Sequence, residues 1–147
     1  MDLGLLTEPH VRALAAERIV ARGDAYCRRG AVLHLALRGD VLHAEVAGTA
    51  DEPYAVRLTT RGDRILARCD CPYAEEWGEW CKHAVAAALA VARGTLPVER
   101  QPTVRELVAP LDRAALVRVL DALVEHDPRV YDAVRLGIEG PSHRGRP

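Results

Sequence analysis

Three cysteines and one histidine gathered within a short stretch constrain the fold of this chain more than any other feature. Cys69, Cys71, Cys81 and His83 follow the spacing C-x-C-x9-C-x-H, whereas Cys27 stands alone. Zinc in proteins takes four nitrogen or sulfur ligands in a tetrahedron, and structural sites are closed by four protein ligands. The spacing therefore predicts one structural Zn2+ that ties an extended segment to the start of a helix.

The local geometry of this stretch supports a shared ion. Residues two apart in an extended chain point to the same side, so Cys69 and Cys71 can reach one ion. Cys81 and His83 approach from the start of a helix, across a nine-residue loop. Three alternatives are weaker. A Cys69–Cys71 disulfide would close a small strained loop, a Cys81 nucleophile activated by His83 lacks a third group to orient it, and chance burial of the thiols is the third.

The hydrophobic pattern predicts an α+β fold around the cluster. A helix is expected over residues 8–22, with Gly23 as its stop. Alternating apolar residues then predict two hairpins that turn at Gly39-Asp40 and Gly62-Asp63, which makes a four-stranded antiparallel sheet. A buried, alanine-rich helix is expected over residues 84–92.

The chain divides into four predicted parts. Residues 1–93 are predicted to form one zinc-binding domain that includes the N-terminal helix and the sheet. A linker with Pro97 and Pro102 follows over residues 94–102. A small helical region is expected over residues 103–139, and residues 140–147 are expected to be a flexible tail.

Composition limits the classes of protein that remain. The 147 residues are 49% hydrophobic and 28% charged, which is typical of a globular chain. No apolar run is long enough to cross a bilayer and no secretory signal opens the chain, so we expect a cytoplasmic protein with thiols rather than disulfides. The net charge is −1, so any nucleic-acid site must be a local patch.

The two predicted hairpin turns fix the register of the sheet and so divide its residues between two faces. The core face is predicted to carry Leu33, Leu35, Leu37, Leu42, Ala44, Val46, Tyr54, Val56, Leu58, Ile65, Ala67, Cys69 and Cys71. The outer face is predicted to carry His34, Arg38, His43, Glu45, Arg57, Arg61, Arg64 and Arg68.

Five of those outer residues are arginines, and guanidinium groups bind phosphates bidentately. Arg38, Arg57, Arg61, Arg64 and Arg68 are therefore candidate nucleic-acid contacts. The alternative is a solvated face, because 19 of the 20 basic residues in this chain are arginine. A second metal site on His34, His43 and Glu45 is disfavoured on an exposed strand pair.

The cysteine and histidine array, with Pro72 after the second cysteine and Cys81-Lys82-His83 opening an alanine-rich helix, resembles the SWIM zinc finger. The resemblance covers residues 50–93, and the preceding strands with Gly48 and Tyr54 resemble the lead-in of bacterial members. It implies a strand-strand-helix module that is non-enzymatic and binds DNA or proteins, as in SWI/SNF-type ATPases and transposases. The implied ligands are Cys69, Cys71, Cys81 and His83. The loop departs from a DNA-facing finger because it carries Glu75, Glu76 and Glu79.

We therefore expect a zinc-binding interaction module with no catalytic residues and no small-molecule substrate. Its partner is DNA through the arginines or, alternatively, a protein such as a SWI/SNF-type ATPase. Three thiolates on Zn2+ leave a net negative site that Arg68 and Lys82 are placed to offset. Trp80 is expected to shield the metal, and Trp77 either does the same or contacts a partner. The C-terminal helices pack on the finger or dock a partner helix.

Overall fold

The chain forms two compact units, Met1–Thr103 and Val104–Pro147. The structure is a computed structural model that describes residues 1–78 and 80–139. The first unit holds the predicted zinc cluster, and the second holds three helices. The predicted tail over residues 140–147 lies outside the described residues.

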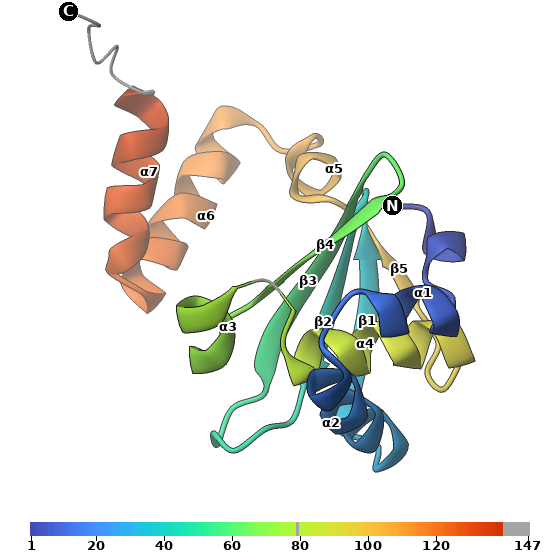
Figure 1. Ribbon diagram of the computed structural model, residues 1–147. Helices are drawn as coiled ribbons and strands as arrows, with labels where there is room; N and C mark the ends of the chain where they lie inside the picture. Colours follow the sequence, from blue (N-terminus) through green and yellow to red (C-terminus); the bar gives the residue numbers. More distant parts are fainter. Residues whose placement is uncertain (79, 140–147) are drawn as a thin grey trace, which may run out of the picture. The chain divides into compact units, whose positions relative to one another are not determined.

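Five strands form one sheet in the first unit, in the order β4-β3-β2-β1-β5 (Figure 1). The strands are β1 (Val32–Arg38), β2 (Val41–Val46), β3 (Tyr54–Arg61), β4 (Arg64–Cys69) and β5 (Glu99–Gln101). The first four are antiparallel, and both predicted turns are confirmed because Arg38 pairs with Val41 and Arg61 with Arg64. The segment 94–102, predicted as a linker, contributes β5, which pairs parallel to β1 and makes the sheet larger than expected.

Helices cover the core face of this sheet. They are the 3-10 turn η1 (Leu3–Leu5) and the helices α1 (Glu8–Ala13), α2 (Glu17–Arg28) and α4 (Lys82–Arg93). Helix α3 (Pro72–Trp77) instead contacts β4, the edge strand of the sheet. Helix α4 crosses the first four strands, and α2 packs against α4 (Figure 1). Every residue from His83 to Ala90 is buried, because the small alanine side chains let the helix lie close to the sheet. The predicted buried helix over residues 84–92 is therefore confirmed.

The single helix predicted over residues 8–22 is wrong. The chain forms α1 and α2 instead, and α2 continues through Gly23 to Arg28. A Cβ atom on Gly23 would lie 2.5 Å from Cβ of Val85 and 2.9 Å from the carbonyl oxygen of Lys82. Gly23 is thus the point where two helices touch rather than a helix stop.

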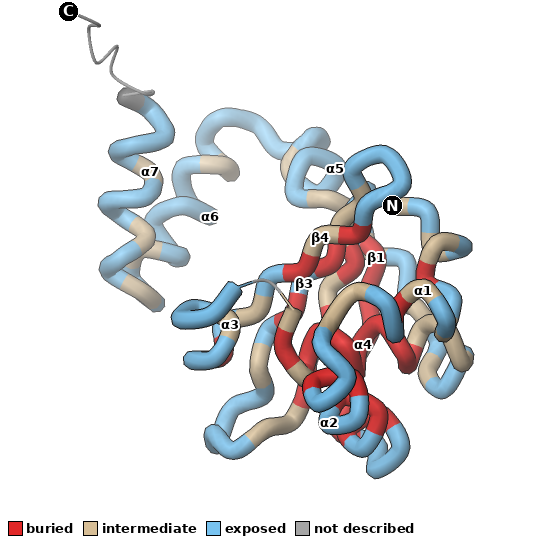
Figure 2. The backbone as a smooth tube through the Cα atoms, viewed as in Figure 1, coloured by how far each residue is buried: buried red, intermediate tan, exposed pale blue. Residues whose placement is uncertain are grey.

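The register also places one predicted core residue on the surface. Leu33 is 51% exposed, because β1 bulges between Val32 and His34. Val32 takes the buried position opposite Val46. Between the bulge and the hairpin turn the strands pair in the predicted register. The buried residues lie mainly in the strands and in α4 (Figure 2).

The second unit consists of α5 (Val104–Val108), α6 (Arg113–His126) and α7 (Arg129–Glu139). The Asp112 carboxylate caps α6 by accepting a hydrogen bond from Ala115 N at 2.7 Å. Helices α6 and α7 contact each other, yet no described residue from 104 to 138 is buried. None of the helices in the described ranges is long and apolar enough to cross a membrane.

Candidate metal centre

Three segments of the first unit bring Cys69, Cys71, Cys81 and His83 together. Cys69 ends β4, Cys71 precedes α3, Cys81 caps α4 and His83 lies in its first turn. Their four ligand atoms all lie within 4.8 Å of one another. The sulfurs of Cys69 and Cys81 lie 3.8 and 3.9 Å from Nδ1 of His83. Tetrahedral zinc would separate sulfur and nitrogen ligands by about 3.6 Å, so the donor set fits one structural Zn2+.

Burial closes this cluster from most of the solvent. Cys71, Cys81 and His83 are 2%, 1% and 2% exposed, and Cys69 is half-buried. Three sulfurs and one imidazole fill a tetrahedron and leave no position for a substrate or a catalytic water. The arrangement therefore suits a structural ion rather than a hydrolytic one.

The start of α4 holds the second pair of ligands in place. The Sγ atom of Cys81 accepts a hydrogen bond from Ala84 N at 3.5 Å and so caps the helix. A thiolate is favoured there because the helix dipole places partial positive charge at the N-terminus. On the other side, Pro72 opens α3 directly after Cys71 and fixes the exit of the chain.

The three clustered thiols shift one another's pKa values. The hydrogen bond from Cys69 lowers the pKa of Cys81 to about 4, against the opposing effect of burial. The same bond to Cys81 raises the pKa of Cys69, and burial raises the pKa of Cys71. Zinc binding must displace the protons held on Cys69 and Cys71. The affinity for the metal is therefore expected to decrease as the pH is lowered.

Two tyrosines hold the ring of His83. The Tyr54 ring stacks on the imidazole at 4.5 Å, and the Tyr26 ring meets it edge-on at 5.4 Å. Gly48 makes room for this stack, because a Cβ atom there would lie 2.2 Å from the Tyr54 ring and 3.3 Å from Nε2 of His83. Nε2 is buried and has no hydrogen-bond partner within the described ranges, so ring packing orients the ligand in place of a hydrogen bond.

Tyr26 was missed from the sequence because the predicted helix stopped before it. The guanidinium carbon of Arg29 lies 3.6 Å from the centroid of the Tyr26 ring, and the ammonium nitrogen of Lys82 lies 4.7 Å from it. Lys82 contributes most to lowering the pKa of the Tyr26 hydroxyl, and Arg29 adds to the effect. Lys82 therefore brings its positive charge beside the ring that supports His83.

The remaining residues predicted around the metal lie in different places. Trp80 packs on the hydrophobic core and lines a surface groove with His10 and Leu14, so its shielding of the metal stays a prediction. Trp77 is 70% exposed at the end of α3. Arg68 lies on the outer face, because it pairs with Arg57 in the sheet.

The predicted arginine face exists as an exposed surface of the sheet. All five arginines are exposed, and Arg57–Arg68 and Arg61–Arg64 are cross-strand pairs. Arg38 donates to the side chain of Gln101 at 2.8 Å. The other four form no ion pair with any described carboxylate: Arg57, Arg61, Arg64 and Arg68.

The electrostatic environment of this face is positive. Burial, together with the charges of Arg38 and Arg57, lowers the pKa of His43, which keeps that imidazole neutral at physiological pH. His34 pairs with Glu99 at 2.8 Å and is not part of a metal cluster with His43 and Glu45. Beside the exposed carboxylate of Glu45, the arginines are thus the groups that give this face its positive charge.

Comparison with known proteins agrees with the geometry. Residues 56–92 match the model of the SWIM zinc finger family. The matched stretch contains β4, α3 and most of β3 and α4, together with all four clustered side chains. Neither the curated proteins nor the solved structures contain a match to the chain.

Proposed function

Because this chain carries a SWIM-type zinc finger, we propose that it is a non-enzymatic module of the cytoplasm that binds nucleic acid in DNA-transaction complexes. One structural Zn2+, held by Cys69, Cys71, Cys81 and His83, would keep the finger folded. The observation that carries the proposal is the set of four arginines without acidic partners on the outer sheet face.

These arginines form a surface that suits a phosphate backbone. Arg57 and Arg68 are direct cross-strand neighbours, and so are Arg61 and Arg64. Directly opposite residues have Cβ atoms about 4.5–5.5 Å apart, so like charges repel and each pair is destabilising unless an anion lies between them. Phosphate groups would relieve this repulsion through charge-assisted hydrogen bonds.

A salt titration tests this proposal. The protein should bind generic duplex and single-stranded DNA with an affinity that falls by a log-log slope of about −0.9 or −0.7 per phosphate contact. Arg57→Ala with Arg64→Ala should reduce that slope by roughly two contacts. Arg113→Ala with Arg118→Ala removes the same charge from α6 and serves as the matched control.

Two results would reject the nucleic-acid interface. One is the absence of binding to either DNA at low salt. The other is an equal loss for the two double variants, which would make the effect one of net charge rather than of this face.

A protein adaptor is the second candidate function, and the helical unit favours it. Large apolar side chains there are more than one third exposed: Val104, Leu107, Leu111, Val117, Val119, Leu120, Leu123, Tyr131, Leu136 and Ile138. Exposed apolar surface of this extent is typical of a docking face. The family resemblance implies a SWI/SNF-type ATPase as the class of partner. A pull-down that persists after nuclease treatment would favour this candidate, and nuclease sensitivity would favour DNA.

A further inference from the structure

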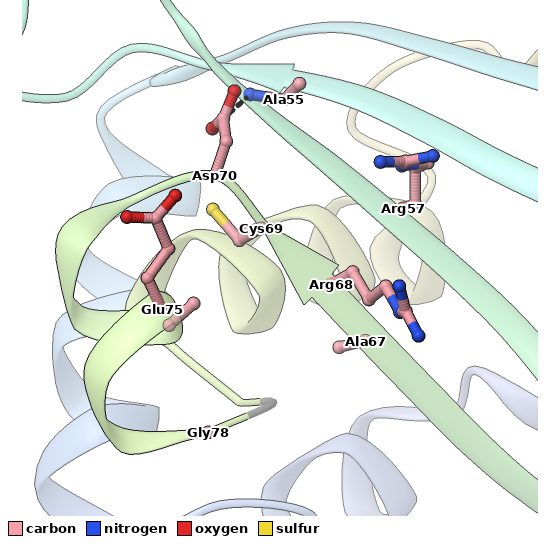
Figure 3. Close-up of a pocket in the computed structure, with 9 residues that line it drawn as sticks. Ala55, Arg57, Ala67, Arg68, Cys69, Asp70, Glu75 and Gly78 are labelled. Carbon is pink, nitrogen blue, oxygen red and sulfur yellow. Dashed lines mark hydrogen bonds between the residues drawn. The ribbon is translucent and has the colours of Figure 1, made fainter. Parts of the chain in front are cut away.

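A groove of about 400 Å³ opens beside the metal cluster, along the end of the edge strand β4. The ends of β3 and β4 form its floor, and α3 forms the opposite wall (Figure 3). Its volume lies within the range of about 300–1,000 Å³ that is typical of small-ligand sites. The groove is therefore large enough to hold one nucleotide unit of a longer strand.

The two ends of the groove carry opposite charges. Arg57 and Arg68 lie at one end, and Asp70 and Glu75 lie at the other (Figure 3). Asp70 is already engaged, because its carboxylate accepts a hydrogen bond from Ala55 N at 2.9 Å. The carboxylate of Glu75 makes no hydrogen bond or ion pair with the described residues. The groove thus offers two guanidinium groups and one unused carboxylate.

A ligand that fits both ends must carry an anion and, some distance away, hydrogen-bond donors. A nucleotide has both, since its phosphate is anionic and its base edge carries N–H groups. Guanine presents two neighbouring donors, N1–H and the 2-amino group, to a carboxylate. Adenine and cytosine present one amino group on that edge, and thymine presents one N–H. The carboxylate therefore favours guanine, and it can reach this edge only when the base is unpaired.

We propose that this groove binds one unpaired guanine nucleotide of a single strand. Arg57 and Arg68 hold its phosphate, and the Glu75 carboxylate accepts hydrogen bonds from N1–H and the 2-amino group. This inference rests on the proposed nucleic-acid binding and adds strand type and base preference to it.

The metal cluster holds the two walls of this groove together. Cys69 and Cys71 flank Asp70, so ligation of both sulfurs fixes the turn between β4 and α3. That turn sets the distance between Arg68 on the strand and Glu75 on the helix. Zinc should consequently be needed for base preference as well as for folding.

The test uses the full chain and an oligothymidine strand that carries a single dG, deoxyinosine or dC at its centre. Deoxyinosine lacks only the 2-amino group, so it isolates one of the two proposed hydrogen bonds. The wild type should bind the dG strand about tenfold more tightly than the other two. Glu75→Gln should abolish this preference. Glu76→Gln changes the same charge on the exposed neighbour, which does not line the groove, and should keep the preference.

Equal binding of the dG and deoxyinosine strands by the wild type would overturn the guanine site, and so would an equal effect of Glu75→Gln and Glu76→Gln. Either result leaves the arginine face standing as a nucleic-acid interface, provided that oligothymidine still binds with salt dependence. Absence of binding to every strand at low salt would overturn both proposals together.

Discussion

The two units of this chain differ in how they bury apolar side chains. In the first unit α4 is buried from His83 to Ala90, and the cluster of cysteines and histidine joins its start to the end of β4. In the second unit no described residue is buried, and Leu120 and Leu123 of α6 are 39% and 47% exposed. A segment of that size has too little core to be stable by itself. The finger therefore carries its own stability, whereas the helices depend on what they contact.

The largest expected effect is the loss of the metal. Cys81→Ser, or removal of zinc by a chelator, should unfold the finger, because a structural zinc site supplies about 10–16 kcal/mol of apparent binding free energy. Amide hydrogen exchange should rise across β3, β4 and α4 and change little in α6 and α7. Cys27→Ala is the control, since this buried cysteine lies outside the cluster and the variant should retain zinc.

Retention of full amide protection in the finger after zinc removal would contradict the claim that the metal stabilises the first unit. The hydrophobic core around α4 would then suffice for folding, and the metal would serve some other purpose.

Two glycine substitutions should change stability by smaller amounts, and in opposite directions in the two units. Gly23→Ala should destabilise the finger by about 1–3 kcal/mol, because the new methyl group would overlap Val85 at the contact of α2 and α4. Gly137→Ala in α7 meets no atom within 4 Å and should stabilise its helix by up to about 1 kcal/mol. Denaturant unfolding of the two variants measures both changes. Effects of the same sign would contradict the difference in packing.

The smallest expected effect is a pH dependence within the first unit. Arg93 of α4 donates hydrogen bonds to Glu8 at 2.8 and 2.9 Å and to Asp24 at 2.6 Å. The bonds from Arg93, and next those from Arg12, lower the pKa of Glu8 from 4.5 to about 2. For Asp24 burial alone would raise the pKa, but Arg93 and Arg28 hold it below its usual value.

A carboxyl group with a depressed pKa stabilises the fold above its unfolded pKa and loses that contribution as the pH falls through its folded pKa. The gap in unfolding free energy between wild type and Glu8→Gln should therefore be constant above about pH 5 and close between pH 4.5 and about 2. Because acid also protonates the zinc ligands in both proteins, the difference between them is the quantity to measure. A gap that does not change with pH would show that this network contributes no stability.

The sequence predicted the first four strands, both hairpin turns, the helix after His83 and the convergence of the four clustered side chains, since each depends on local patterns. It failed where contacts between distant segments decide the structure. Gly23 was read as a helix stop because its contact with Val85 lies far along the chain. Because the predicted helix ended at Gly23, Tyr26 was not recognised as a neighbour of His83. Strand β5 was missed because it is short and pairs with β1, which lies far from it in the sequence.

The bulge that exposes Leu33 is a further example of this limit. Strict alternation cannot reveal an extra residue in one strand. The predicted pairing is therefore correct from the hairpin turn to His34, and beyond the bulge it is wrong by one residue. The tyrosines around His83 likewise depend on the packing of α2 and β3 against α4, which no spacing rule contains.

X-ray absorption at the zinc edge of the purified full chain tests the central claim most directly. We predict one zinc per chain, with three sulfur ligands at about 2.3 Å and one nitrogen ligand at about 2.0–2.1 Å. A preparation without stoichiometric metal, or a spectrum that requires oxygen ligands in place of sulfur, would contradict this account.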